Sequence, residues 1–130
     1  MNVKQAVPFF NVSNMETSLR FYVDGLGFTI KLRWIDEGQL RWCWLSLGDA
    51  ALMLQEFKTH PEKPGEGVTI CFICEDALAL YREWKTRGLT PQRPFVGNQM
   101  WVVNLSDPDG YKLSFESDTD AEEESEYIES

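Results

Sequence analysis

The chain repeats itself weakly at an offset of 61–62 residues, and this repeat limits the folds that it can adopt. Three pairs of dipeptides carry it: Phe21-Tyr22 and Glu83-Trp84, Gly27-Phe28 and Gly88-Leu89, and Met53-Leu54 and Ser114-Phe115. An internal repeat of this kind indicates one supersecondary unit used twice. A unit of about 60 residues buries little of its own sheet face, so we expect the two copies to share one core.

Each copy is predicted to consist of one strand, one helix and three further strands. In the first copy we expect strands at 6–10, 28–34, 39–47 and 50–56. Ser13-Asn14-Met15-Glu16 has the spacing of a capping box, which satisfies the first amides of a helix. Apolar residues then recur at 3.6-residue spacing up to Leu26, and Gly25 or Gly27 can end the helix.

The second copy has the same order of predicted elements. Its strands are expected at 68–73, 94–97, 100–105 and 110–117, and Asp76 can cap a helix that stops at Gly88. The turn Asp107-Pro108-Asp109-Gly110 feeds the last strand. We therefore expect a single domain over 1–117, with module one at 4–57, a linker at 58–66 and module two at 67–117.

The charge distribution argues against some classes of partner, and the cysteines indicate the cellular compartment. The net charge is −9, and residues 118–130 hold seven acids and no base, so the remainder carries −2. We expect 118–130 to be a disordered acidic tail that disfavours nucleic acid and anionic membranes. The first residues lack a signal-peptide layout, and the odd number of cysteines is typical of reduced thiols, which predicts a cytoplasmic protein.

Three segments resemble the vicinal oxygen chelate superfamily. They are AVPFFNVSNMETSLRFYVDGLGF, WLSLGDAALMLQE and NLSDPDGYKLSFES, and the resemblance covers about residues 4–117. That superfamily includes glyoxalase I, extradiol dioxygenases, fosfomycin-modifying enzymes and bleomycin-resistance proteins. The resemblance implies an α+β fold, in which two βαβββ modules form a U-shaped mixed sheet with helices on one face. It also implies a homodimer, which is common among members.

Metal enzymes of that superfamily carry their ligands on the first and last strands of each module. By motif spacing, the resemblance places these positions at Val7, Met53, Thr69 and Ser114. None is a His, Glu, Asp or Gln, which Zn, Fe, Mn or Ni would require. A slip of one residue would bring in Gln55 or Glu56, but a slip also moves a side chain to the other sheet face. We therefore expect no metal and no other cofactor.

Strand alternation predicts which residues lie on the sheet face away from the helices, here called the open face. A two-residue turn at Gly48-Asp49 would pair Trp44 with Met53 and Trp42 with Gln55. The predicted ligand-binding residues are Phe9, Trp42, Trp44, Met53, Gln55, Thr69, Asn104, Ser114 and Glu116. Mostly apolar walls with a few polar groups are typical of small-molecule sites, and aromatic faces also suit flat or cationic ligands.

The sequence leaves more than one function open. The first hypothesis is a metal-free protein that binds or sequesters a small molecule, like bleomycin-resistance proteins, with no catalytic residue. The alternative is a glyoxalase-like lyase or isomerase, or a dioxygenase-related enzyme, with a divergent metal site or with Glu116 as general base. A third reading is an interaction protein whose open face is core or interface. Cys71 and Cys74 match C-x-x-C spacing, but residues three apart on a strand face opposite sides, which favours a structural role.

Overall fold

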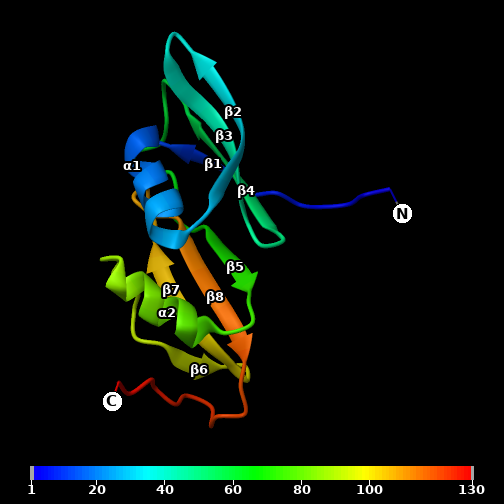
Figure 1. Ribbon diagram of the computed structural model, residues 1–130, viewed down its shortest axis with the longest axis vertical. Coiled ribbons are helices and arrows are strands. Elements are labelled where there is room, and N and C mark those ends of the chain that lie inside the picture. The colour runs from blue at the N-terminus through cyan, green and yellow to red at the C-terminus, as the bar shows by residue number, and fades with distance from the viewer. Residues whose placement is uncertain (1, 130) are drawn as a thin grey trace. The chain divides into compact units, whose positions relative to one another are not determined.

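The computed structural model describes residues 2–129 of the chain. It divides into two compact units, one ending at Glu66 and the other beginning at Gly67. Within the described residues, no helix has the length and apolar character needed to cross a membrane. Both units have the same order of elements, a strand, a helix and three strands, so the predicted α+β fold of two βαβββ modules is confirmed (Figure 1).

Unit one contains a four-stranded mixed sheet in the order β1-β4-β3-β2. Its elements are β1 (Phe9–Val12), α1 (Met15–Leu19), the π-helical η1 (Arg20–Leu26), β2 (Thr29–Asp36), β3 (Gln39–Leu47) and β4 (Ala50–Glu56). Strand β1 runs parallel to β4, and the other pairs are antiparallel. The first strand begins at Phe9 rather than the predicted Ala6, because Pro8 has no N–H to donate to a ladder.

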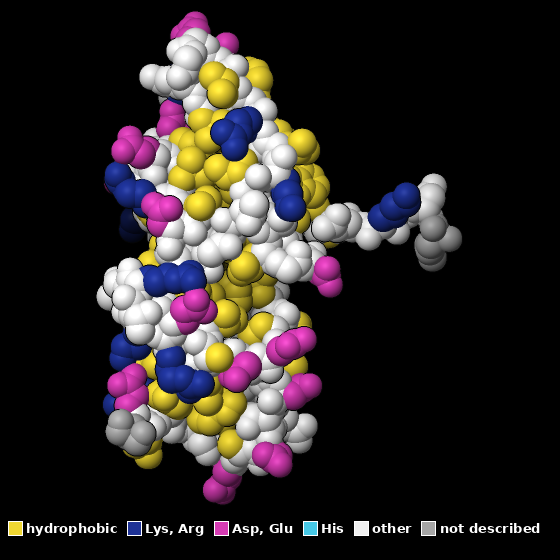
Figure 2. Space-filling view, in the orientation of Figure 1, with side chains coloured by type: hydrophobic (Ala, Val, Ile, Leu, Met, Phe, Trp, Pro, Cys, Tyr) yellow, Lys and Arg dark blue, Asp and Glu magenta, His cyan; other side chains and the backbone are white. Residues whose placement is uncertain are grey.

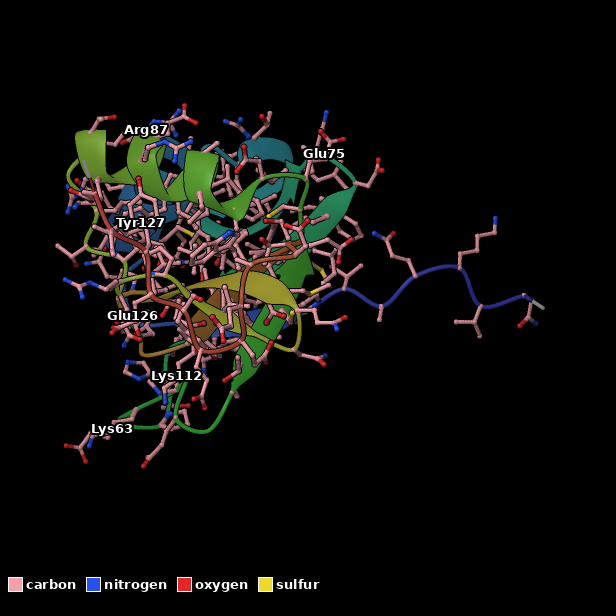
Figure 3. All side chains as sticks on the ribbon, turned by 90° about the horizontal axis from the view of Figure 1, so that it is seen from below. Lys63, Glu75, Arg87, Lys112, Glu126 and Tyr127 are labelled. Carbon is pink, nitrogen blue, oxygen red and sulfur yellow. The ribbon has the colours of Figure 1, made fainter. Side chains whose placement is uncertain are left out.

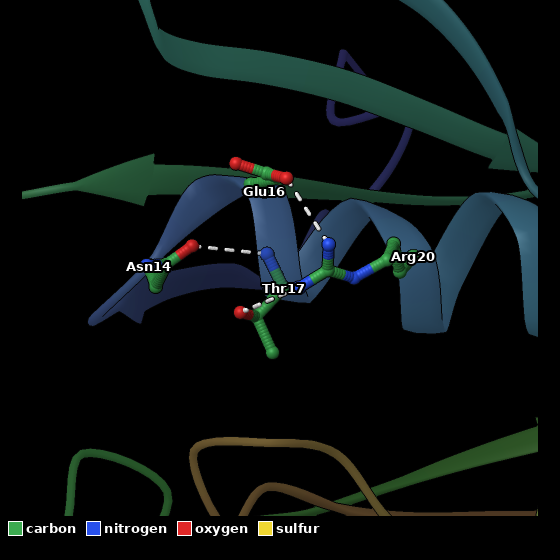
Figure 4. Close-up of polar contacts among 4 residues, drawn as sticks. All are labelled: Asn14, Glu16, Thr17 and Arg20. Atoms are coloured by element: carbon green, nitrogen blue, oxygen red, sulfur yellow. Dashed lines mark hydrogen bonds and ion pairs between the residues drawn. The ribbon is translucent and has the colours of Figure 1, made fainter.

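The helix of unit one begins with an asparagine cap. The Asn14 side chain accepts a hydrogen bond from the Thr17 N–H at 3.0 Å, and Arg20 pairs with Glu16 at 3.1 Å (Figure 4). The cap is therefore one residue later than the expected Ser13, and Thr17 N–H takes the place of Glu16 N–H as its donor. Gly27 ends the helical segment with φ of 99°, a left-handed conformation that glycine adopts without strain.

Unit two repeats this arrangement with the sheet order β5-β8-β7-β6. Its elements are β5 (Thr69–Ile73), α2 (Ala77–Thr86), β6 (Phe95–Gly97), β7 (Met100–Ser106) and β8 (Lys112–Asp118). Asp76 caps α2 as predicted, accepting from the Ala79 N–H at 3.0 Å. Strand β8 starts two residues later than expected, because hydrogen bonds within 107–111 close the turn before it.

Each unit packs its helix against one face of its own sheet. In unit one the buried side chains of β3 and β4 are Cys43, Leu45, Leu52 and Leu54. In unit two the buried side chains are Leu113, Phe115, Val103 and Trp84 of α2. The ring centroids of Trp84 and Phe115 are 4.7 Å apart. Buried and partly exposed residues alternate along β3 and β4 as predicted, whereas in β8 Leu113, Ser114 and Phe115 are all buried.

The C-terminal segment differs from the disordered tail expected over 118–130. Asp118 still belongs to β8, and the backbone of residues 119–127 forms several hydrogen bonds to the β6–β7 region. The ring of Tyr127 contacts those of Tyr81 and Trp101. Acidic composition predicted solvation, but backbone pairing along a strand edge does not depend on side-chain polarity.

Candidate functional site

The open face of unit one carries two rows of side chains across its sheet. The register aligns four apolar residues in the first row, and an aromatic pair followed by two amides in the second. The rows are Leu32, Trp44, Met53 and Phe9, then Trp34, Trp42, Gln55 and Asn11. The predicted pairs Trp44 with Met53 and Trp42 with Gln55 are confirmed. None of the eight side chains is charged, so this face is an apolar surface bearing two amides.

Several of these side chains are strongly exposed for apolar residues. Leu32 is 57% exposed, Trp34 49% and Phe9 48%. On the side that Figure 2 shows, where the helices lie in front of the strands, further hydrophobic side chains gather over unit one. Phe57 extends the surface beside Phe9, with ring centroids 6.2 Å apart. Exposed apolar groups in a contiguous patch mark binding surfaces, whereas scattered ones do not.

Sequence reasoning missed Leu32, Trp34 and Phe57 at this face. The signal for the first two was the alternation within 28–34, where Leu32 and Trp34 share a parity. The pairing of β2 with β3 shifts register on either side of the Leu32–Trp34 stretch. Because of these shifts, residue spacing from a turn does not predict which face Leu32 and Trp34 occupy. Phe57 follows β4 in the parity of Gln55, one residue beyond the strand.

Gln55 and Glu56, the two residues that a one-residue shift in register would bring to a ligand position, lie on opposite faces of the sheet. Gln55 is on the open face, whereas Glu56 points toward the helix and accepts the Met15 N–H at 2.7 Å. Its other oxygen accepts from Arg41 at 2.5 Å. Glu56 also borders a hollow of about 460 Å³ beside α1, on the helix side of the sheet. Glu56 is therefore a structural group of the helix start.

The open face of unit two is more polar than that of unit one. Its register forms a row of Cys71, Ser114 and Asn104, and a second row of Ile73, Glu116, Val102 and Phe95. The Ser114 hydroxyl, in a residue only 5% exposed, donates to the Glu116 carboxylate at 2.8 Å. Thr69 lies one row farther along, beside Lys112. The structure thus brings Ser114, Glu116 and Asn104 together, and Thr69 lies at the margin.

The thiols of both units are protonated at neutral pH. Burial raises the pKa of the Cys43 thiol, in the core of unit one, to about 11. Desolvation, followed by the neighbouring Glu116 carboxylate, raises the pKa of Cys71 to about 11 although much of that residue is exposed. Cys74 follows β5, where its sulfur donates to the Glu116 carbonyl oxygen at 3.5 Å. A thiol with a raised pKa is a weak nucleophile and a weak metal ligand.

The donor set does not fit a metal ion of the kind that the resemblance implies. In unit one the register places Phe9, not Val7, beside Met53, and in unit two it places Cys71, not Thr69, beside Ser114. A phenyl ring, a thioether and a hydroxyl are poor partners for these ions. Over residues 2–129, no three His, Cys, Asp or Glu side chains are close enough to hold one.

Comparison with protein families identifies the scaffold. Residues 4–115 match the model of the Glyoxalase/Bleomycin resistance protein/Dioxygenase superfamily. The chain belongs to this superfamily. The match covers both βαβββ modules, so superfamily membership accounts for the whole architecture up to β8. No curated protein sequence matches the chain at a significant level.

Solved structures of several other proteins share this fold at low sequence identity. TnmS3, an antibiotic binding protein from Streptomyces sp. CB03234, has a TM-score of 0.72 at 24% identity, over 92% of this chain and 99% of that one. A bleomycin resistance determinant encoded on the transposon Tn5 has a TM-score of 0.73 at 24% identity, over 89% and 98%. A bleomycin-binding protein complexed with bleomycin has a TM-score of 0.70 at 24% identity, over 89% and 99%.

Proposed function

We propose that this protein binds a small molecule on the open faces of its sheets, without a metal and without chemistry. The observation that carries the proposal is the contiguous apolar surface of unit one. Three of the five tryptophans of the chain, Trp34, Trp42 and Trp44, lie there with Leu32 and Phe9. Exposing such apolar side chains to water is unfavourable, so their clustering on one face favours a ligand that covers them.

The chemistry of the two faces indicates the class of ligand. The indole faces of unit one suit a flat aromatic group, since offset stacking contributes about 0.5–1.5 kcal/mol beyond burial. The two rows of side chains in unit one hold no charged group that could pair with a charge on a ligand. In unit two, Glu116 is a carboxylate on an open face, with Ser114 orienting one of its oxygens. We therefore propose that the open face of unit one binds planar aromatic groups and that the open face of unit two, considered separately, binds cationic groups.

The structural neighbours support the proposal that the ligand is a small molecule. One is described as an antibiotic binding protein and another is complexed with bleomycin, so this scaffold holds such molecules in those proteins. The proposed absence of a metal rests on the available donors, because the register pairs Phe9 with Met53 in unit one and Cys71 with Ser114 in unit two. The homodimer and the cytoplasmic location expected from the sequence remain predictions.

Titration of the tryptophan fluorescence tests the proposed binding. We expect bleomycin or the planar cation proflavine to quench the fluorescence saturably, and Trp42→Ala to weaken the binding about three- to tenfold, the equivalent of one stacking contact. Trp101→Phe is the matched control, because Trp101 lies on the helix side of its sheet. Glu116→Gln tests the open face of unit two separately and should weaken binding of a cation there. If no compound in a panel of aromatic cations causes saturable quenching, the proposal is wrong.

The second candidate is an enzyme that uses Glu116 as a proton acceptor. The observation that favours it is the hydrogen bond from the nearly buried Ser114 hydroxyl, which holds one carboxylate oxygen in place. An isomerase or lyase of this kind would lose turnover in Glu116→Gln while retaining its substrate affinity. Activity that a chelator abolishes would instead indicate a relocated metal site.

A further inference from the structure

The segment after β8 follows the exposed edge of β6. Strand β6 is an edge strand, because the sheet order of unit two ends with it. Three backbone hydrogen bonds, each 2.9 Å long, join the segment to this edge: Val96 N–H to Ser125 O, Glu124 N–H to Val96 O, and Tyr127 N–H to Pro94 O. Phe95 and Glu126 form an antiparallel bridge in the same register. The segment thus pairs with β6 as a neighbouring strand would.

An aromatic side chain fixes the position of the segment along this edge. The Tyr127 ring packs edge-on to Tyr81 of α2, with centroids 5.5 Å apart, and to Trp101 of β7, with centroids 6.4 Å apart. In Figure 3 Tyr127 lies beside α2, whereas Glu126 lies farther from the helix. Aromatic pairs of this geometry are favourable. Tyr127 is therefore an anchor between the helix and the sheet.

The segment also caps the turn between β6 and β7. Asn98 and Gln99 have φ of 52° and 64°, the left-handed conformation of a type I′ hairpin turn. The backbone N–H groups of both donate to the Glu123 carboxylate, so one side chain satisfies the two donors that the turn leaves outside the ladder. The Thr119 N–H donates to Gln99 O at 3.0 Å and completes the contact.

Opposite charges accompany this contact. Lys85 of α2 pairs with Glu129 at 2.7 Å, and Arg93 pairs with Glu126 at 3.7 Å. Both pairs are exposed, and such pairs contribute little to stability in water. They match the acidic segment to basic residues beside this edge, whereas backbone pairing and Tyr127 hold it there.

We propose that residues 119–129 are a built-in cover for the edge of β6, which keeps this strand from pairing with a second copy of the chain. An uncovered edge presents unpaired N–H and C=O groups and is a template for another strand. Proteins protect edges with charged side chains, prolines or bulges, but β6 is Phe95-Val96-Gly97 and has none of these within it. The C-terminal segment supplies the protection that the strand itself lacks.

A proline pair in the full chain tests the proposal without removing the segment. Glu124→Pro with Tyr127→Pro deletes two of the three backbone donors and also the anchoring ring. Ile128→Pro is the matched control, because Ile128 is 85% exposed. Hydrogen exchange measured by NMR reports the cover directly through the Val96 amide, which donates to Ser125, and sedimentation velocity over a range of concentrations reports association.

We expect the Val96 amide of the double variant to exchange at least about tenfold faster than in the unmodified chain, the equivalent of one hydrogen bond. We also expect association beyond that of the unmodified chain, rising with concentration, and no change in Ile128→Pro. An unchanged exchange rate at Val96 would overturn the proposed cover. Faster exchange with unchanged association would overturn its role against pairing.

A second experiment supplies the C-terminal segment as a separate peptide. A chain ending at Asp118 is mixed with a synthetic peptide of residues 119–129. We expect the peptide to restore protection of the Val96 amide and to reverse the extra association in a dose-dependent way. A peptide in which Tyr127 is replaced by serine should be at least about threefold weaker, for loss of the aromatic contacts. Equal potency of the two peptides, or no effect of either, would contradict the proposal.

Discussion

Glu56 offers the sharpest quantitative test of how unit one is built. Its two oxygens serve different groups, since one accepts the Met15 N–H at 2.7 Å and the other accepts from Arg41 at 2.5 Å. Both charged side chains are about a quarter exposed. A charge-assisted hydrogen bond to a helix amide is worth about 1.5–3 kcal/mol, whereas a partly exposed ion pair is worth about 0.2–1 kcal/mol.

Glu56→Ala removes both interactions, so we expect it to lower the free energy of unfolding by about 2–4 kcal/mol. Arg41→Met removes only the ion pair and should lower it by about 1 kcal/mol or less. Glu56→Gln keeps an oxygen that can accept from Met15 and should fall between the two variants. Urea denaturation monitored by circular dichroism measures each free energy, and the double variant gives the coupling between Glu56 and Arg41.

The outcome also decides between a structural and a functional role for this carboxylate. If Glu56→Ala and Arg41→Met cost the same, the hydrogen bond to the helix start contributes nothing and the reasoning fails. If Glu56→Ala leaves stability unchanged but abolishes a chelator-sensitive activity, Glu56 is a ligand and not a cap.

Three further predictions concern the other caps, turns and buried groups. Asp76→Ala should destabilise the protein by about 1 kcal/mol by removing the cap of α2, as measured by thermal unfolding. Asp107→Ala should cost about 2–3 kcal/mol, because one buried oxygen accepts from both Asp109 N–H and Tyr111 N–H, and Asp107→Asn should restore most of it. The pKa of Cys43 is raised from 9.0 to about 11, so its thiol ionises more readily in the unfolded chain; the free energy of unfolding should fall as the pH rises from 9 to 11, and less so in Cys43→Ala.

The sequence predicted the strands of unit one well where local signals agree. The bounds of β3 and β4 match those expected, because strict alternation on both sides of the Gly48-Asp49 turn allows only one register. The same alternation correctly divided the tryptophans from the buried leucines. The assignment of the open face therefore rested on turn geometry and side-chain parity, both of which are local.

Features that depend on distant partners were not predictable in this way. The surface at Leu32 and Trp34 is set by irregular pairing with β3. The ordering of the C-terminal segment arises from backbone pairing to β6, which leaves no periodicity in an acidic stretch. In each case the deciding contact joins residues far apart in the chain.

The parallel pairs β1–β4 and β5–β8 have a consequence for the order of folding. The antiparallel hairpins close over turns of a few residues, but β1 meets β4 across 44 residues, Phe9 with Met53, and β5 meets β8 across 43, Thr69 with Lys112. Closing a longer loop costs more chain entropy, so contacts of this separation form late. Each module should therefore form its three antiparallel strands first, and β1 or β5 should pair with them last. A growing chain accordingly has to complete β4 before the Phe9 side of the open face of unit one can exist.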